Sequence, residues 1–178
     1  MGEIKSTLDL VMEKTKNLNL SNEEREQQKN TEIKNRLHGL VQKFQDKILD
    51  NDNLRSDYQK LKKEYGLTNH RQLIEEICSQ VLPGKDNDAL FDLLAEFDVS
   101  DSERLKSVLE EFEAVYNTAA GERRKIIKDQ LAKTHFISGP AVAPNLENDG
   151  EWHQTSEKIK LTYTRLLDAE KSKLFKGQ

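Results

Sequence analysis

Apolar residues recur every three or four positions along almost the whole chain, which is the period of one face of an α-helix. The pattern begins within residues 1–20 and continues through residues 22–65, 68–81, 86–97, 100–116, 122–131 and 152–174. No stretch alternates apolar and polar residues for long enough to predict a β-strand. The sequence therefore predicts an all-α fold, a multi-helix bundle, with Gly121 separating two of the helices.

Local signals mark where the helices should begin and end. Ser21–Glu24 and Ser100–Glu103 are capping boxes, in which a hydroxyl and a carboxylate bond free amides at a helix start. Thr68 and Asp86 are suitable caps for two further helices. Gly66 is a helix stop, because glycine readily adopts the left-handed conformation after the last turn.

Residues 22–65 could form one long helix or a helical hairpin. One helix of 44 residues would span about 66 Å, whereas a compact chain of 178 residues has a diameter of about 40 Å. A continuous helix would therefore project as an arm. Eight of its ten a and d heptad positions are apolar, which is typical of a coiled coil. The a positions are Leu37, Phe44, Asn51, Tyr58 and Tyr65, and the d positions are Ile33, Leu40, Lys47, Leu54 and Leu61.

An arm of this kind predicts self-association into a homo-oligomer. Its interface would consist of four apolar anchors and one polar a residue that fixes the register, namely Leu54, Tyr58, Leu61, Tyr65 and Asn51. The alternative is a break at residues 50–53, because Asp and Asn favour turns. Residues 33–49 and 54–65 would then fold back on each other, and no arm would exist.

One long segment, residues 134–150, is incompatible with a helix. Pro140 and Pro144 interrupt any helix, and a structureless loop of this length is unusual in a compact domain. The segment also carries the apolar residues Phe136, Ile137, Val142 and Leu146. We expect it to pack across the helices as a strap, or else to line a binding groove. The candidate ligand region consists of three residues at its ends, His135, Trp152 and His153.

Charge is unevenly distributed along a chain whose net charge is −4. Residues 66–117 hold 4 basic and 12 acidic residues and are the richest in apolar positions. This composition predicts an extended helical region over residues 1–66 and a compact helical domain over residues 67–178. Arg123, Arg124, Lys125 and Lys128 form a basic cluster, which we expect to face the acidic middle zone.

The sequence lacks the common catalytic and metal-binding patterns. None of the four histidines has another histidine within five residues, and neither a P-loop nor a G-x-G-x-x-G motif occurs. Cys78 lies on an apolar helix face, so we expect an inert, buried thiol. The sequence therefore predicts no catalytic residue, no metal and no cofactor.

These observations favour a protein that works by association. We expect a cytoplasmic, non-enzymatic protein that binds itself or another protein, because there is no signal peptide, no membrane-spanning stretch and no basic surface for nucleic acid. If the protein binds another protein, the acidic zone of residues 86–113 would be the docking face. The alternative is a small all-α enzyme or ligand-binding protein with its site under the loop of residues 134–153.

Overall fold

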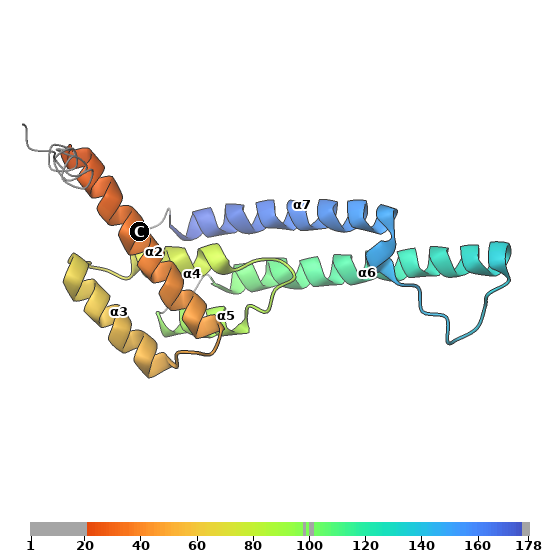
Figure 1. The fold of residues 1–178 in the computed structure, drawn as a ribbon, viewed down its shortest axis with the longest axis horizontal. Helices are drawn as coiled ribbons and strands as arrows, with labels where there is room; N and C mark the ends of the chain where they lie inside the picture. Colours follow the sequence, from red (N-terminus) through yellow and green to blue (C-terminus); the bar gives the residue numbers. More distant parts are fainter. Residues whose placement is uncertain (1–20, 98, 100–101, 176–178) are drawn as a thin grey trace, which may run out of the picture. The chain divides into compact units, whose positions relative to one another are not determined.

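The computed structural model describes residues 21–97, 99 and 102–175 (Figure 1). The described residues form helices and connecting loops without a β-strand, which confirms the all-α prediction. The chain divides into two compact units, Met1–Thr68 and Asn69–Gln178. The helix predicted within residues 1–20 and the capping box at Ser100 lie outside the described residues.

The first unit contains a helical hairpin. Helix α2 (Asn22–Gln45) and helix α3 (Asn51–Tyr65) run in opposite directions and pack side by side. The predicted capping box at Ser21 and the predicted stop at Gly66, with φ +70°, are both confirmed. The apolar side chains buried in this unit are the heptad residues Ile33, Leu37, Leu40, Leu54, Tyr58 and Leu61, together with Val41.

The turn between the two helices lies at residues 46–50, slightly before the predicted break. The Asp50 side chain caps α3 by accepting a hydrogen bond of 2.8 Å from the Asn53 amide. Lys47 has a left-handed backbone with φ +57°, which is unfavourable for a residue other than glycine, and the neighbouring Ile48 side chain is 69% exposed. Of the two arrangements that the sequence allows, the structure has the hairpin.

The second unit is built on two long antiparallel helices. Helix α6 (Ser102–His135) and helix α7 (Gly150–Leu174) lie side by side (Figure 1). The ring of Phe112 on α6 packs 5.7 Å from the ring of Tyr163, and Tyr116 packs 5.1 Å from Trp152. Two short helices, α4 (Arg71–Gln80) and α5 (Asp88–Glu96), complete the packing, with α5 contacting α6.

The caps predicted for the two short helices are wrong. Thr68 does not cap α4, whose N-cap is His70. The N-cap of α5 is Asn87 rather than Asp86. Asp86 instead accepts a bond of 3.1 Å from the amide of Asp88. The sequence thus located both helices but not their first residues, because several polar residues before each helix can accept such bonds.

Helix α6 continues through Gly121, so the predicted break there is wrong. A glycine inside a helix costs only about 1 kcal/mol relative to alanine. The neighbouring side chains more than compensate for that cost, because Ala120 is buried against Leu146 and Trp152, and Ile127 packs on the same cluster.

Replacing Gly121 by alanine is expected to stabilise the second unit by about 0.5–1 kcal/mol, because it removes the entropic penalty of glycine. A Cβ atom at this position meets no other atom within 4 Å. Thermal melts of the full chain measure the effect. Gly84→Ala is the matched control, since φ at Gly84 is +72° and that variant should lose stability. A destabilised Gly121→Ala variant would contradict this account.

The segment after α6 packs over the helices in part. Leu146, in the short 3-10 helix η1 (Leu146–Asn148), is buried against Ala120 and Trp152. Phe136 and Ile137, at the start of the segment, are 90% and 49% exposed. Only the second half of the segment is therefore the strap that the sequence predicts.

An ion pair fastens the end of this strap to α6. The guanidinium of Arg123 donates to both carboxylate oxygens of Asp149, at 2.8 and 2.7 Å, and it also binds Glu151. Asp149 is in addition the N-cap of α7, accepting from the Trp152 amide at 2.6 Å. Arg123 therefore faces α7 and not the acidic middle zone, so for this residue the predicted orientation of the basic cluster is wrong.

The variant Asp149→Asn is expected to melt at a lower temperature than the parent chain at pH 7. Hydrogen bonding to Arg123 holds the pKa of the Asp149 carboxyl below its usual value of 3.8. Its stabilising contribution is therefore present above pH 4 and is lost as the pH falls towards the folded-state pKa. The difference in melting temperature should shrink as the pH falls below 4, while Asn still caps α7. A difference independent of pH would show that the charge is irrelevant.

The single cysteine lies inside the second unit. Cys78 is 1% exposed, and burial raises the pKa of its thiol to about 11, so the thiol stays protonated at neutral pH. Nearby, the ammonium of Lys171 on α7 donates a hydrogen bond of 2.8 Å to the carbonyl of Val81 at the end of α4. The predicted burial of the cysteine is confirmed.

Candidate functional site

The residues predicted for self-association lie on α3. Leu54, Tyr58 and Leu61 are buried, with exposures of 0%, 2% and 7%. The hydroxyl of Tyr65 donates a hydrogen bond of 2.6 Å to Glu32 on α2, and Asn51 is an exposed residue at the start of α3. These side chains therefore form the seam of the hairpin. Their role between chains stays a prediction.

The three residues predicted to form a ligand region are not brought together. His135 is the last residue of α6, about 22 Å along the helix from Ala120, which packs beside Trp152. Trp152 is 7% exposed. His153 is exposed and lies 2.6 Å from the carbonyl of Glu147 through its Nε2 atom. The structure thus gives Trp152 a packing contact and leaves the two histidines at separate places.

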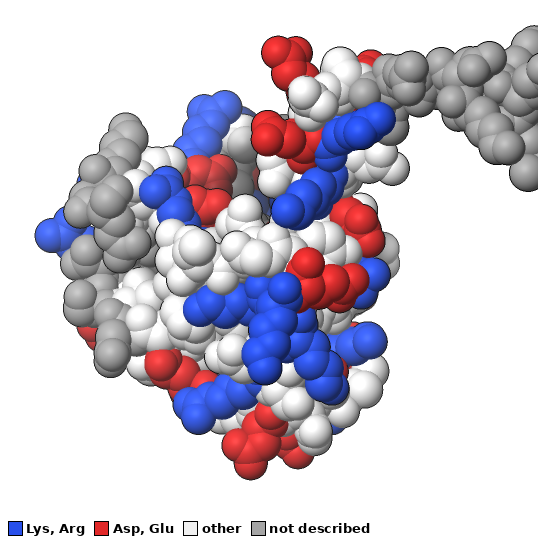
Figure 2. All heavy atoms as spheres, turned by 90° about the vertical axis from the view of Figure 1, so that its left-hand side faces the viewer, with Lys and Arg blue, Asp and Glu red and all other residues white. Residues whose placement is uncertain are grey.

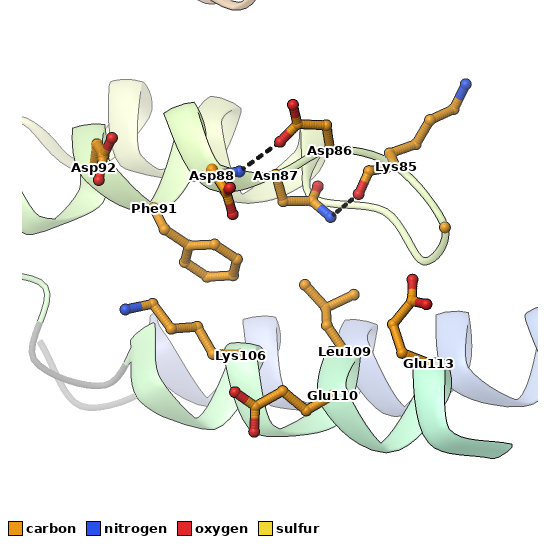
Figure 3. A pocket seen from close by; sticks show the side chains of 11 residues that line it. Lys85, Asp86, Asn87, Asp88, Phe91, Asp92, Lys106, Leu109, Glu110 and Glu113 are labelled. Atoms are coloured by element: carbon orange, nitrogen blue, oxygen red, sulfur yellow. Dashed lines mark hydrogen bonds between the residues drawn. The ribbon is translucent and has the colours of Figure 1, made fainter. Parts of the chain in front are cut away.

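A groove of about 660 Å³ lies elsewhere in the second unit, between the α4–α5 loop, α5 and α6 (Figure 3). Side chains of Phe91 and Leu109 point towards one another from α5 and α6 and form its apolar floor (Figure 3). Polar and charged residues surround this floor. They are Lys85, Asp86, Asn87, Asp88, Asp92, Lys106, Glu110 and Glu113.

The loop on one side of the groove is fixed by a buried asparagine. Asn87 is 7% exposed and makes three hydrogen bonds to the loop backbone. Its side-chain oxygen accepts from the Leu82 amide at 3.1 Å, and its side-chain nitrogen donates to the carbonyls of Leu82 and Lys85 at 2.9 and 2.8 Å. Gly84 allows the chain to turn with φ +72° beside the ring of Phe112. This wall of the groove is therefore preformed.

A lysine lies across the floor of the groove. The Lys106 ammonium is 5.5 Å from the centre of the Phe91 ring and 2.9 Å from a carboxylate oxygen of Glu103. The hydrogen bond that Lys106 donates to Glu103, followed by the charges of Glu103, Asp92 and Glu110, raises the pKa of Lys106. The groove thus already holds one cation over an aromatic face, an arrangement that is attractive in its own right.

The charge of the groove is negative overall. Its lining contains five carboxylates and two lysines, a net charge of −3. Among the described residues there is no group of three or more histidine, cysteine or acidic side chains placed to hold a metal ion. The arrangement combines an apolar floor with an acidic rim. Such a surface attracts cations and can bury an apolar side chain beside them.

Sequence reasoning located part of this groove. The acidic zone of residues 86–113 contains most of its lining, and the apolar residues Leu90, Leu93 and Leu94 of this zone are buried. The role of Asn87 was missed. The available signal was the sequence Pro83–Asp88, in which proline, glycine and asparagine indicate a tight turn.

Charged side chains of both signs are distributed over the molecule. On the face that Figure 2 shows, basic and acidic side chains lie beside one another. Several are joined as exposed local pairs, such as Lys60 with Asp57 and Lys160 with Glu157, which contribute little to stability. No helix among the described residues has both the length and the apolar character that crossing a membrane requires.

Comparison of the chain with protein-family models, curated proteins and solved structures found no match. Function is therefore inferred from the chemistry of the residues described above.

Proposed function

We propose that this protein acts by binding another protein, and that the groove between α5 and α6 receives a basic segment of that partner. This is a non-enzymatic role in which the groove recognises a shape and a charge. The observation that carries the proposal is the combination of an apolar floor, Phe91 and Leu109, with an acidic rim of five carboxylates.

The geometry of the groove supports a peptide-sized occupant. A volume of about 660 Å³ is in the range of protein ligand sites, and the Asn87 hydrogen bonds hold its loop in place before binding. A preformed wall reduces the entropy that binding must overcome. An apolar side chain of the partner would pack on Phe91 and Leu109.

Charge supports a basic partner over an acidic one. Carboxylates from both sides of the groove, including Asp88 and Asp92 on α5 and Glu110 and Glu113 on α6, would pair with lysine or arginine. Like charges would repel an acidic segment, which provides selectivity. An incoming arginine could also take the place of Lys106 over the Phe91 ring.

The test uses the full, ¹⁵N-labelled chain and a synthetic peptide of repeated Lys-Leu-Lys triplets, followed by NMR titration. We expect saturable shifts at the amides of Phe91, Asp92 and Leu109, and none with a matched Glu-Leu-Glu peptide. The double variant Asp92→Lys, Glu110→Lys should raise the Kd at least about tenfold, since it reverses two charges of the rim.

The control variant makes the same change of charge at two residues that lie away from the groove. Glu111 and Glu122 are exposed on α6 but do not line the groove, so Glu111→Lys, Glu122→Lys should leave the Kd within about threefold. Three outcomes would contradict the proposal. They are the absence of binding, shifts centred on other residues, and an equal loss of affinity in both double variants, which would indicate attraction by overall charge alone.

A further inference from the structure

The heptad pattern of residues 33–65 is symmetric about the turn of the hairpin. Counting equal distances from Leu49, every a position falls opposite a d position. The opposed pairs are Leu37 with Leu61, Phe44 with Leu54, Tyr58 with Leu40, Tyr65 with Ile33, and Asn51 with Lys47. This is the register of an antiparallel coiled coil, in which each a layer meets a d layer.

The contacts of the hairpin follow this register. Tyr65 bonds to Glu32, and Arg36 lies 3.7 Å from Glu64, both nearly symmetric about Leu49. The guanidinium of Arg36 also lies 5.8 Å from the centre of the Tyr65 ring. These contacts at the open end of the hairpin agree with the register, which the turn at residues 46–50 interrupts next to the Asn51–Lys47 pair.

The turn itself is the unfavourable part of the hairpin. Lys47 adopts φ +57°, and the amides of Ile48 and Leu49 both share the carbonyl of Lys43 as acceptor, at 2.9 and 3.2 Å. Ile48 is 69% exposed. A straight helix through residues 46–50 would return Lys47 to ordinary helical geometry and give each of these amides its own acceptor.

We propose that the hairpin opens into one helix over residues 22–65, and that two chains in this form pair antiparallel through the same seam. The partner of this surface is a second copy of the chain. Each α2 then packs on the α3 of the other copy, so that every contact of the hairpin is reproduced between chains. Such an exchange of identical elements is a low-cost route to a dimer.

The exchanged dimer gains contacts that the hairpin lacks. The two copies of Ile48 meet across the two-fold axis, so this exposed side chain becomes buried. Asn51 of one copy meets Lys47 of the other at the central layer, where a polar pair fixes the register. The two copies of Asp50 also approach one another, and their repulsion limits the stability of the dimer.

The proposal accounts for a heptad pattern that passes through the turn without a change of phase. A hairpin alone needs apolar residues on each side of its turn, but it does not need the residues before and after the turn to share one heptad phase, as Phe44 and Leu54 do. The dimer does not depend on the groove of the second unit. Failure of peptide binding and failure of the exchange are therefore separate results.

The experiment measures an intrachain distance in the full chain by pulsed electron paramagnetic resonance. Spin labels replace the exposed residues Asn35 and Lys63 in a Cys78→Ala background, and labelled chains are diluted into unlabelled ones. In the hairpin the labels lie roughly 20–30 Å apart, because the helix axes are 8–10 Å apart. In the open helix, 28 residues separate them by about 42 Å.

We expect the longer distance to appear as the protein concentration rises, together with a species of twice 20.5 kDa in sedimentation. Lys47→Gly should lower the dimerisation constant at least about tenfold, since glycine favours the left-handed turn and disfavours the helix. Ile48→Asp should act in the same direction without affecting the hairpin. Lys60→Gly is the control, because residue 60 is helical in both forms.

Three results would overturn the proposal. A monomer with only the short distance at all concentrations would show that the hairpin does not open. A dimer that keeps the short distance would show that the chains associate through another surface. Equal effects of Lys47→Gly and Lys60→Gly would likewise show that the turn does not control association.

Discussion

Replacing Phe112 by alanine is expected to destabilise the second unit by about 3–5 kcal/mol, which corresponds to a fall in melting temperature of roughly 10–20 °C. Phe112 is 2% exposed and stands where the two long helices meet the loop before α5. Its ring packs 5.4 Å from Tyr116 and 5.7 Å from Tyr163. Truncation removes these contacts and leaves a cavity that neighbouring side chains fill only in part.

The same substitution should weaken peptide binding. A Cβ atom at Gly84 would lie 3.6 Å from the Phe112 ring, so this ring supports the loop that forms one wall of the groove. Val115→Ala is the matched control, because Val115 is 42% exposed on the same helix and should change the free energy of unfolding by no more than about 0.5 kcal/mol. Thermal and denaturant unfolding measure both. A loss below 1 kcal/mol for Phe112→Ala would contradict this description of the core.

The helical period predicted the fold class because it depends on local spacing alone. Apolar residues at steps of three and four identify a buried helix face wherever that face packs. Because the spacing is local, it does not identify the surface against which that helix face packs. The seam residues Leu54, Tyr58 and Leu61 are compatible with an arm, a hairpin or an exchanged dimer, since each option buries the same helix face.

Local signals failed where tertiary packing decides. Gly121 reads as a helix break in isolation, but the cluster of Ala120, Leu146 and Trp152 holds α6 intact across it. The contact of Ala120 with Leu146 joins residues far apart in the sequence, and no local pattern reveals it. The acidic zone predicted the negative charge of the groove. Its shape depends on how Asn87 binds the loop backbone and how Phe91 faces Leu109.

The double variant Leu54→Asp, Leu61→Asp is expected to unfold the N-terminal hairpin and to leave the second unit folded. Leu54 is 0% and Leu61 is 7% exposed, so both new carboxylates would be buried without a partner. Each would cost several kcal/mol, and the small core of two helices, of 24 and 15 residues, has little stability to lose. The second unit has its own core around Leu90, Leu94 and Phe112.

Hydrogen–deuterium exchange measures this effect helix by helix in the full chain. Amides of α2 and α3 should lose their protection, while those of α6 and α7 keep it. Ser56→Asp, Gln59→Asp is the matched control, because it adds the same charge to exposed positions of α3 and should leave the hairpin intact. Loss of protection in α6 and α7 would show that the two units unfold together.

Because the hairpin and the exchanged dimer bury the same two leucines, the double variant should also remain a monomer at every concentration.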